Sequence, residues 1–230
     1  MDIETAIQIL ETDSRQISET TLNSIKNIHK QFSSLLCAKY YNWQHECSCG
    51  YFISEYIINI KTVSVQDDID AIFLYARRLL EVFITLKYMS QTNSFNKIVD
   101  YCESDRCEYL AGCEARVVAD EKLFPDLKGI NPFRLGYKQE KENILKHYNG
   151  KLRKMPTMKK MAEKVGYIEE YNYFYKFTSK ILHFCPFSLN GDARFEDKIH
   201  KVVFLRRISK YLEEINRELE NIYQNISNIF

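Results

Sequence analysis

The sequence predicts an all-α protein, a helical bundle of about eight helices that form a single domain over residues 1–230. Glycine and proline are scarce: the chain has 7 Gly and 4 Pro, where average usage would give about 27 in total. Apolar side chains recur at helical spacing through long stretches, and apolar residues make up 45% of the chain. These observations disfavour turn-rich β folds and disordered chains.

The apolar spacing divides the chain into long segments that contain little glycine or proline. It predicts helices over 2–12, 15–40, 49–62, 66–90, 93–121, 138–148, 157–183 with a break at Gly166, and 193–228. Asp67, Asn93 and Asp192 are predicted N-caps, since each places a short acceptor side chain before an apolar periodic run. Breakers gather in 124–157, which predicts an irregular excursion between two helical halves. They are Pro125, Gly129, Pro132, Gly136, Gly150 and Pro156.

Charge and cysteine usage indicate a cytoplasmic protein without a membrane segment. Positive and negative charges nearly balance, with 32 Lys+Arg against 31 Asp+Glu, and the N-terminus carries acid where a signal peptide carries base. The seven cysteines form an odd set and are predicted to be buried thiols. His45, Cys47 and Cys49 have no second Cys/His pair, so we predict no metal site. No phosphate-binding or dinucleotide motif is present, and we predict no cofactor.

Two helices carry narrow polar strips on otherwise apolar circumferences. The strip on 66–90 holds Asp67, Asp70, Arg77, Arg78, Glu81, Thr85 and Tyr88. The strip on 168–183 holds Glu169, Asn172, Lys176, Ser179, Lys180 and His183. If the strips oppose each other, Arg78, Glu81, Ser179 and His183 converge in a polar pocket suited to acid/base chemistry. Alternatively both strips face solvent, and Arg77 or Arg78 pairs with Glu81 on the helix surface.

These residues also carry a family resemblance. The stretch Tyr75-Ala-Arg-Arg-Leu-Leu-Glu81-Val-Phe-Ile-Thr-Leu-Lys-Tyr88 is followed by Arg106-x-x-Tyr109, and later by Tyr175-x3-Ser179-x3-His183 with Pro186 after it. Over about 70–190 the chain resembles an all-helical bacterial family of unknown function that has an R-x-x-E helix and a late S-x3-H helix. The resemblance implies that Arg78, Glu81, Ser179 and His183 are the site residues, and it implies no established reaction.

A looser resemblance is to the HEPN superfamily of small helical bundles, whose ribonucleases carry an Arg, four to six residues, and then a His. Here Arg194 and His200 are separated by five residues. The resemblance implies metal-independent RNA cleavage, in which His acts on the 2′-hydroxyl or the leaving oxygen and Arg stabilises charge on the phosphate.

RNA would require an electropositive approach surface, and one segment of the chain supplies candidates for it. Within 146–164 the predicted RNA-binding residues are Lys151, Arg153, Lys154, Lys159 and Lys160. The alternative is a solvated loop whose lysines keep a nearly neutral protein in solution.

Two functions of different classes therefore remain open. The first is a HEPN-like metal-independent endoribonuclease in a bacterial defence or toxin setting, with Arg78, Glu81, Ser179 and His183 as the site and Arg194 with His200 as the alternative pair. The second is a non-catalytic helical interaction module that binds a protein partner or a second copy. An exposed apolar stripe along Ile208, Leu212, Ile215 and Leu219 would favour the module.

Overall fold

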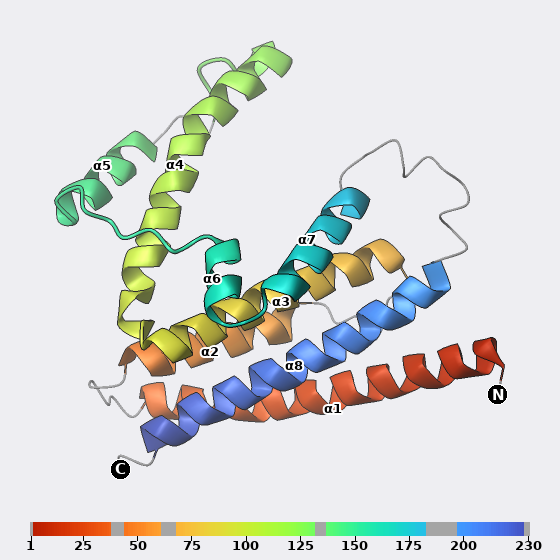
Figure 1. Cartoon of the computed structure of the whole chain (residues 1–230). Helices are drawn as coiled ribbons and strands as arrows, with labels where there is room; N and C mark the ends of the chain where they lie inside the picture. Colours follow the sequence, from red (N-terminus) through yellow and green to blue (C-terminus); the bar gives the residue numbers. More distant parts are fainter. Residues whose placement is uncertain (1, 38–43, 61–67, 132–136, 183–196, 228–230) are drawn as a thin grey trace. The chain divides into compact units, whose positions relative to one another are not determined.

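A computed structural model describes residues 2–37, 44–60, 68–131, 137–182 and 197–227. Within these residues the chain forms eight α-helices and two short 3-10 segments, Phe95–Lys97 and Pro125–Leu127, and no strand (Figure 1). The predicted all-α class is confirmed. The chain divides into two compact units, Met1–Phe95 with Thr157–Phe230, and Asn96–Pro156.

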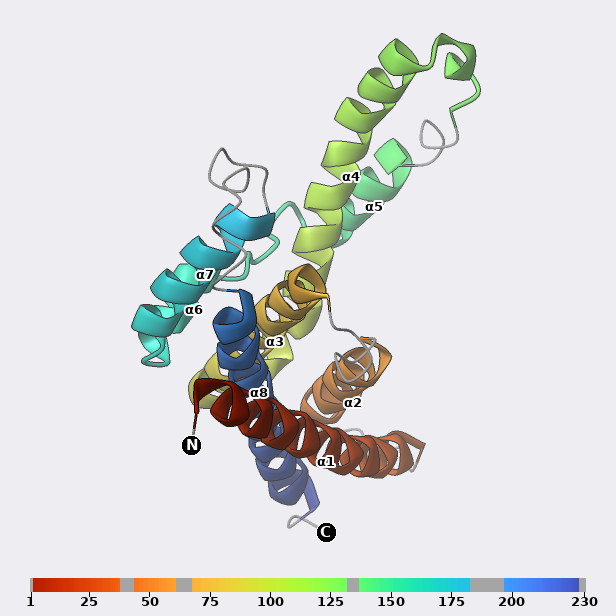
Figure 2. The ribbon, with the colours of Figure 1, turned by 90° about the vertical axis from the view of Figure 1, so that its right-hand side faces the viewer.

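The first unit contains six helices, of which α1, α2 and α3 pack against α8. The six helices are α1 (Ile3–Cys37), α2 (Gln44–Asn59), α3 (Ile69–Thr92), α6 (Met158–Lys164), α7 (Ile168–Leu182) and α8 (Asp197–Ser227). In Figure 2, α8 lies between α1 and α3, and it packs against both. Helix α2 contacts α1 and α8, while α6 and α7 contact α3.

The core of this unit lies on both sides of α8. The stripe Ile208, Leu212, Ile215 and Leu219 is at most 1% exposed, so this stripe is core and offers no docking surface for a partner. An aromatic cluster joins three helices, with ring centroids 4.3 Å apart for Phe73 and Phe204 and 4.9 Å apart for Phe174 and Phe204. Its fourth ring, Phe177, stacks on Phe204 at 5.5 Å.

Helices α1 and α2 approach closely at Gly50. A Cβ atom built there would lie 2.4 Å from Cζ of Phe32, and Phe32 is fully buried. Glycine is unfavourable inside a helix, and this contact is the physical reason for its presence in α2.

Several predicted boundaries differ from the structure. Helix α1 runs without the expected break at 13–14, because the Ser14 hydroxyl donates to the Leu10 carbonyl oxygen at 2.7 Å and leaves the helix intact. Asp68, not Asp67, caps α3 by accepting from the Asp70 amide at 3.0 Å. Asn93 is the C-cap of α3 with φ of 47°, not an N-cap, since Asn tolerates the left-handed conformation. Asp192 lies outside the described residues.

The second unit contains α4 (Ile98–Leu123) and α5 (Tyr137–His147), which pack on each other. Ion pairs link its segments, including Arg106 with Glu140 and Lys154 with Glu108. The predicted excursion at 124–157 lies almost wholly within this unit. No helix among the described residues has both the length and the apolar character needed to cross a membrane.

Candidate functional site

The side of α3 that faces α7 carries an oriented arginine. Arg77 Nε donates to Glu81 Oε1 at 3.2 Å, and the Arg77 guanidinium lies over the ring of Tyr175 from α7, 4.0 Å from its centroid. Of the two arginines that the sequence left open as partners of Glu81, the structure therefore selects Arg77. Part of the polar strip on α3 does face α7.

Tyrosines form the surface of α7 that meets Arg77. Tyr171 stacks on Tyr175 with the ring centroids 4.9 Å apart. Burial and the neighbouring Tyr175 raise the pKa of Tyr171, and Glu81 adds to this rise while Arg77 opposes it. At four-residue spacing, Ser179 follows Tyr175 by one turn of α7. The Ser179 side chain and all of His183 lie outside the described residues.

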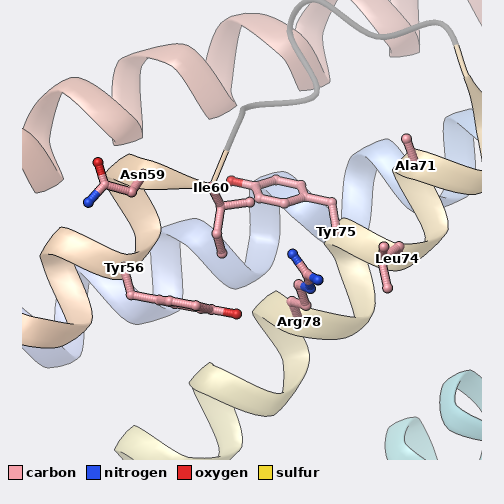
Figure 3. Close-up of a pocket in the computed structure, with 7 residues that line it drawn as sticks. All are labelled: Tyr56, Asn59, Ile60, Ala71, Leu74, Tyr75 and Arg78. Atoms are coloured by element: carbon pink, nitrogen blue, oxygen red, sulfur yellow. The ribbon is translucent and has the colours of Figure 1, made fainter. Parts of the chain in front are cut away.

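Arg78 belongs to a different neighbourhood. It lines a pocket of about 540 Å³ between α3 and the C-terminal end of α2, together with Tyr56 and Asn59 (Figure 3). The Arg78 side chain is exposed, and no ion pair or hydrogen bond joins it to any residue within the described ranges. Arg78 and Glu81, predicted to act together, thus have different partners in the structure.

Tyr75 forms the buried wall of the same pocket. It is only 4% exposed, yet its hydroxyl has no hydrogen-bond partner in the described part of the chain. Burial, together with the nearby Tyr56, raises the pKa of Tyr75, so the phenol stays protonated at neutral pH. A buried hydroxyl without a partner is uncommon in folded proteins.

Of the alternative pair, Arg194 and His200, only His200 lies within the described residues. His200 is half-buried on α8, with its ring 5.0 Å from that of Phe177 in the aromatic cluster. Arg194 lies outside the described residues, so the pairing of Arg194 with His200 stays a prediction.

The five predicted RNA-binding residues fall into both units. Lys151, Arg153 and Lys154 belong to Asn96–Pro156, whereas Lys159 and Lys160 belong to α6 in the other unit. Lys154 pairs with Glu108, and Arg153 Nε lies 4.0 Å from Asp100 Oδ2. Acidic side chains of α4 therefore neutralise part of the basic run. All five basic side chains are exposed.

The cysteine cluster of α2 points into the protein. Cys47 and Cys49 are buried while His45 is exposed, and the Cys47 thiol donates to the Phe32 carbonyl oxygen at 3.6 Å. Burial raises the pKa of Cys47 to about 11, which keeps the thiol protonated. No set of His, Cys, Asp and Glu side chains within the described ranges is arranged to hold a metal ion.

Sequence reasoning identified α3 and α7 but missed the contribution of α2. Tyr56 and Asn59 belong to no motif, and Tyr56 looked like one apolar residue among many in its helix. Only the position of α2 beside α3 places them near Arg78.

One comparison with known proteins found a relationship. The sequence profile described as "Family of unknown function (DUF5677)" matches residues 51–201. This span contains α3, α7 and all four residues that the family resemblance implied: Arg78, Glu81, Ser179 and His183. No curated protein and no solved structure matches the chain.

Proposed function

Because this chain belongs to DUF5677, a family of unknown function, we propose an activity from its residues: it is a HEPN-like, metal-independent endoribonuclease that acts in a bacterial defence or toxin setting. The observation that carries the proposal is the arginine held at the contact of α3 with α7. Arg77 is fixed by Glu81 on one side and by the ring of Tyr175 on the other.

An arginine in this setting suits a phosphodiester. Its planar guanidinium presents several donors that match phosphate oxygens, and a carboxylate that fixes one edge reduces the conformational freedom lost on binding. Glu81 is a positioning residue in this scheme. Arg78 is the next residue along α3 but lines the pocket beside α2, so the proposal gives it no contact with the scissile phosphate.

Ser179 and His183 supply the remaining chemistry of the proposal. His183 accepts the proton of the RNA 2′-hydroxyl, and the 2′-oxygen attacks the adjacent phosphorus. The bond from phosphorus to the 5′-oxygen breaks, the leaving oxygen takes up a proton, and the products are a 2′,3′-cyclic phosphate and a 5′-hydroxyl. Arg77 stabilises negative charge on the phosphoryl oxygens, and Ser179 donates a hydrogen bond beside His183.

RNA binding is proposed to use the exposed basic residues that form no ion pair with a described residue. Lys151, Lys159 and Lys160 are exposed and form no ion pair with a described residue. Arg153 and Lys154 should contribute less, because Asp100 and Glu108 already compensate their charges. The competing interaction module would need a surface other than the α8 stripe, since that stripe is buried.

The test is RNA cleavage in the presence of EDTA. The wild type should cleave total cellular RNA and leave 2′,3′-cyclic phosphate ends, and His183→Ala should lower the rate at least about a hundredfold. His147→Ala is the matched control, because His147 is exposed on α5 and lies outside the proposed site. A wild type without activity, or a His183→Ala variant as active as His147→Ala, would contradict the proposal.

The alternative pair is tested in the same assay with His200→Ala. If only His200→Ala loses RNA cleavage, the catalytic histidine is His200 at the start of α8 and not His183. A loss in His183→Ala alone would leave the α3 and α7 site as the catalytic one.

A further inference from the structure

We propose that the pocket between α2 and α3 binds a nucleoside monophosphate, with the phosphate on Arg78 and the base on the exposed ring of Tyr56. This site is separate from the contact of Arg77 with α7, and the inference does not depend on RNA cleavage. The ligand is either a free nucleotide or one nucleotide of an RNA strand.

The anion-binding element is Arg78. Its guanidinium is exposed and forms no ion pair with a described residue, whereas the charge of neighbouring Arg77 is compensated by Glu81. Figure 3 shows Arg78 between Tyr75 on one side and Tyr56 on the other, with the Tyr56 hydroxyl directed toward it. A guanidinium and a phenol hydroxyl are both donors, which is the combination that phosphate oxygens require.

The ring-binding element is Tyr56. Tyr56 comes from α2 and is 45% exposed, and Tyr75 comes from α3 and is 4% exposed. Both line the pocket, and the exposed ring of Tyr56 is the one that a base can reach. Aromatic side chains stack on nucleobases and hold bases of any identity, because every base has a π-face.

Two further features favour a nucleotide over a smaller aromatic anion. A pocket of about 540 Å³ is in the size range of sites for whole small-molecule ligands and is much larger than one benzoate-like ring. Asn59 lines the same pocket, and its amide offers both a donor and an acceptor to the edge of a base.

The test is equilibrium binding of AMP to the full chain by calorimetry. Adenosine, which lacks the phosphate, and inorganic phosphate, which lacks the nucleoside, are measured as the two halves of AMP. AMP should bind at least about tenfold more tightly than either half, because it fills both elements of the pocket. Arg78→Gln should weaken AMP at least about tenfold and leave adenosine unchanged, since only the phosphate loses its partner. Tyr56→Ala should weaken both AMP and adenosine.

Arg206→Gln is the matched control, because Arg206 is an exposed arginine on α8 in the same unit. It should bind AMP like the wild type. The proposal is overturned if AMP does not bind up to about 10 mM, or if Arg78→Gln binds AMP as tightly as Arg206→Gln.

A further titration identifies the source of the nucleotide. A 2′-O-methylated A6 RNA cannot undergo attack by a 2′-hydroxyl, so its binding is measured without cleavage. Tighter binding of A6 than of AMP assigns the pocket to an RNA strand, and tighter binding of AMP assigns it to a free nucleotide. Because every measurement is of binding, an inactive protein would count against the cleavage proposal and leave this one intact.

Discussion

Substituting Tyr75 by Phe should make the protein more stable, because it removes a buried hydroxyl that has no partner among the described residues. The Tyr75 side chain is 4% exposed and its hydroxyl has no hydrogen-bond partner among the described residues. Leaving a buried hydroxyl unsatisfied costs about 1–3 kcal/mol. Phe keeps the ring and its packing, so Tyr75→Phe should raise the free energy of unfolding by an amount within that range.

Tyr211 provides a matched comparison for the same chemical change. It is 3% exposed, but its hydroxyl donates to Glu170 Oε1, which also accepts from Arg207 Nε at 2.8 Å. Tyr211→Phe therefore deletes a hydrogen bond to a charged group and should lower the free energy of unfolding by about 1.5–3 kcal/mol. The two Tyr→Phe substitutions should thus have opposite signs.

Thermal and chemical unfolding of the two variants and the wild type check this prediction. For a chain of this length, 1 kcal/mol corresponds to a shift in Tm of about 2–4 °C. Tyr75→Phe should melt above the wild type and Tyr211→Phe below it. If Tyr75→Phe melts as far below the wild type as Tyr211→Phe does, the Tyr75 hydroxyl has a partner in the folded protein and the reasoning is refuted.

Three other perturbations should report on packing, charge and capping. Gly50→Ala should lower the free energy of unfolding by about 1–3 kcal/mol, because the new methyl group would meet the Phe32 ring; Phe32→Leu in the same chain should recover part of the loss, and urea titration measures both. Burial alone would raise the pKa of Glu214, but Lys210 and Arg217 hold it below its ordinary value of 4.5. Its contribution to stability is therefore present above about pH 4.5 and is lost as the pH falls through the lower pKa of the folded state; Glu214→Gln should flatten the acid limb of a plot of Tm against pH. Asn93→Ala should cost about 1 kcal/mol and Asn93→Gly should cost nothing, since φ there is 47°; a fall in Tm with both variants would contradict this reading.

The helices were predictable because their signal is local. Apolar residues three and four positions apart mark the buried face of each helix, and the pattern held for α3, α5, α7 and α8 within a few residues. The false break in α1 and the reversed role of Asn93 arose because Ser and Asn side chains fit both inside a helix and at its ends. Only the main-chain conformation distinguishes those uses.

The candidate site was predictable in composition and not in arrangement. The sequence placed Arg77, Arg78 and Glu81 on one strip, and the match to DUF5677 includes them all. It did not show that Arg77 contacts Glu81 and Tyr175, or that Arg78 shares a pocket with Tyr56. It also left the α8 stripe open as a docking surface, although those residues are core.

By itself, the sequence determined the all-α class, the main helices and the polar residues that interrupt their apolar faces, because each of these depends on neighbours within about one helical turn. The tertiary structure decided what each of those residues meets. Successive residues on a helix point about 100° apart, so Arg77 and Arg78 face different neighbours, and which neighbours they are depends on how α2 and α7 pack against α3. That packing follows from burial contributed by the whole unit, with α8 between α1 and α3, and no local pattern along the chain contains it.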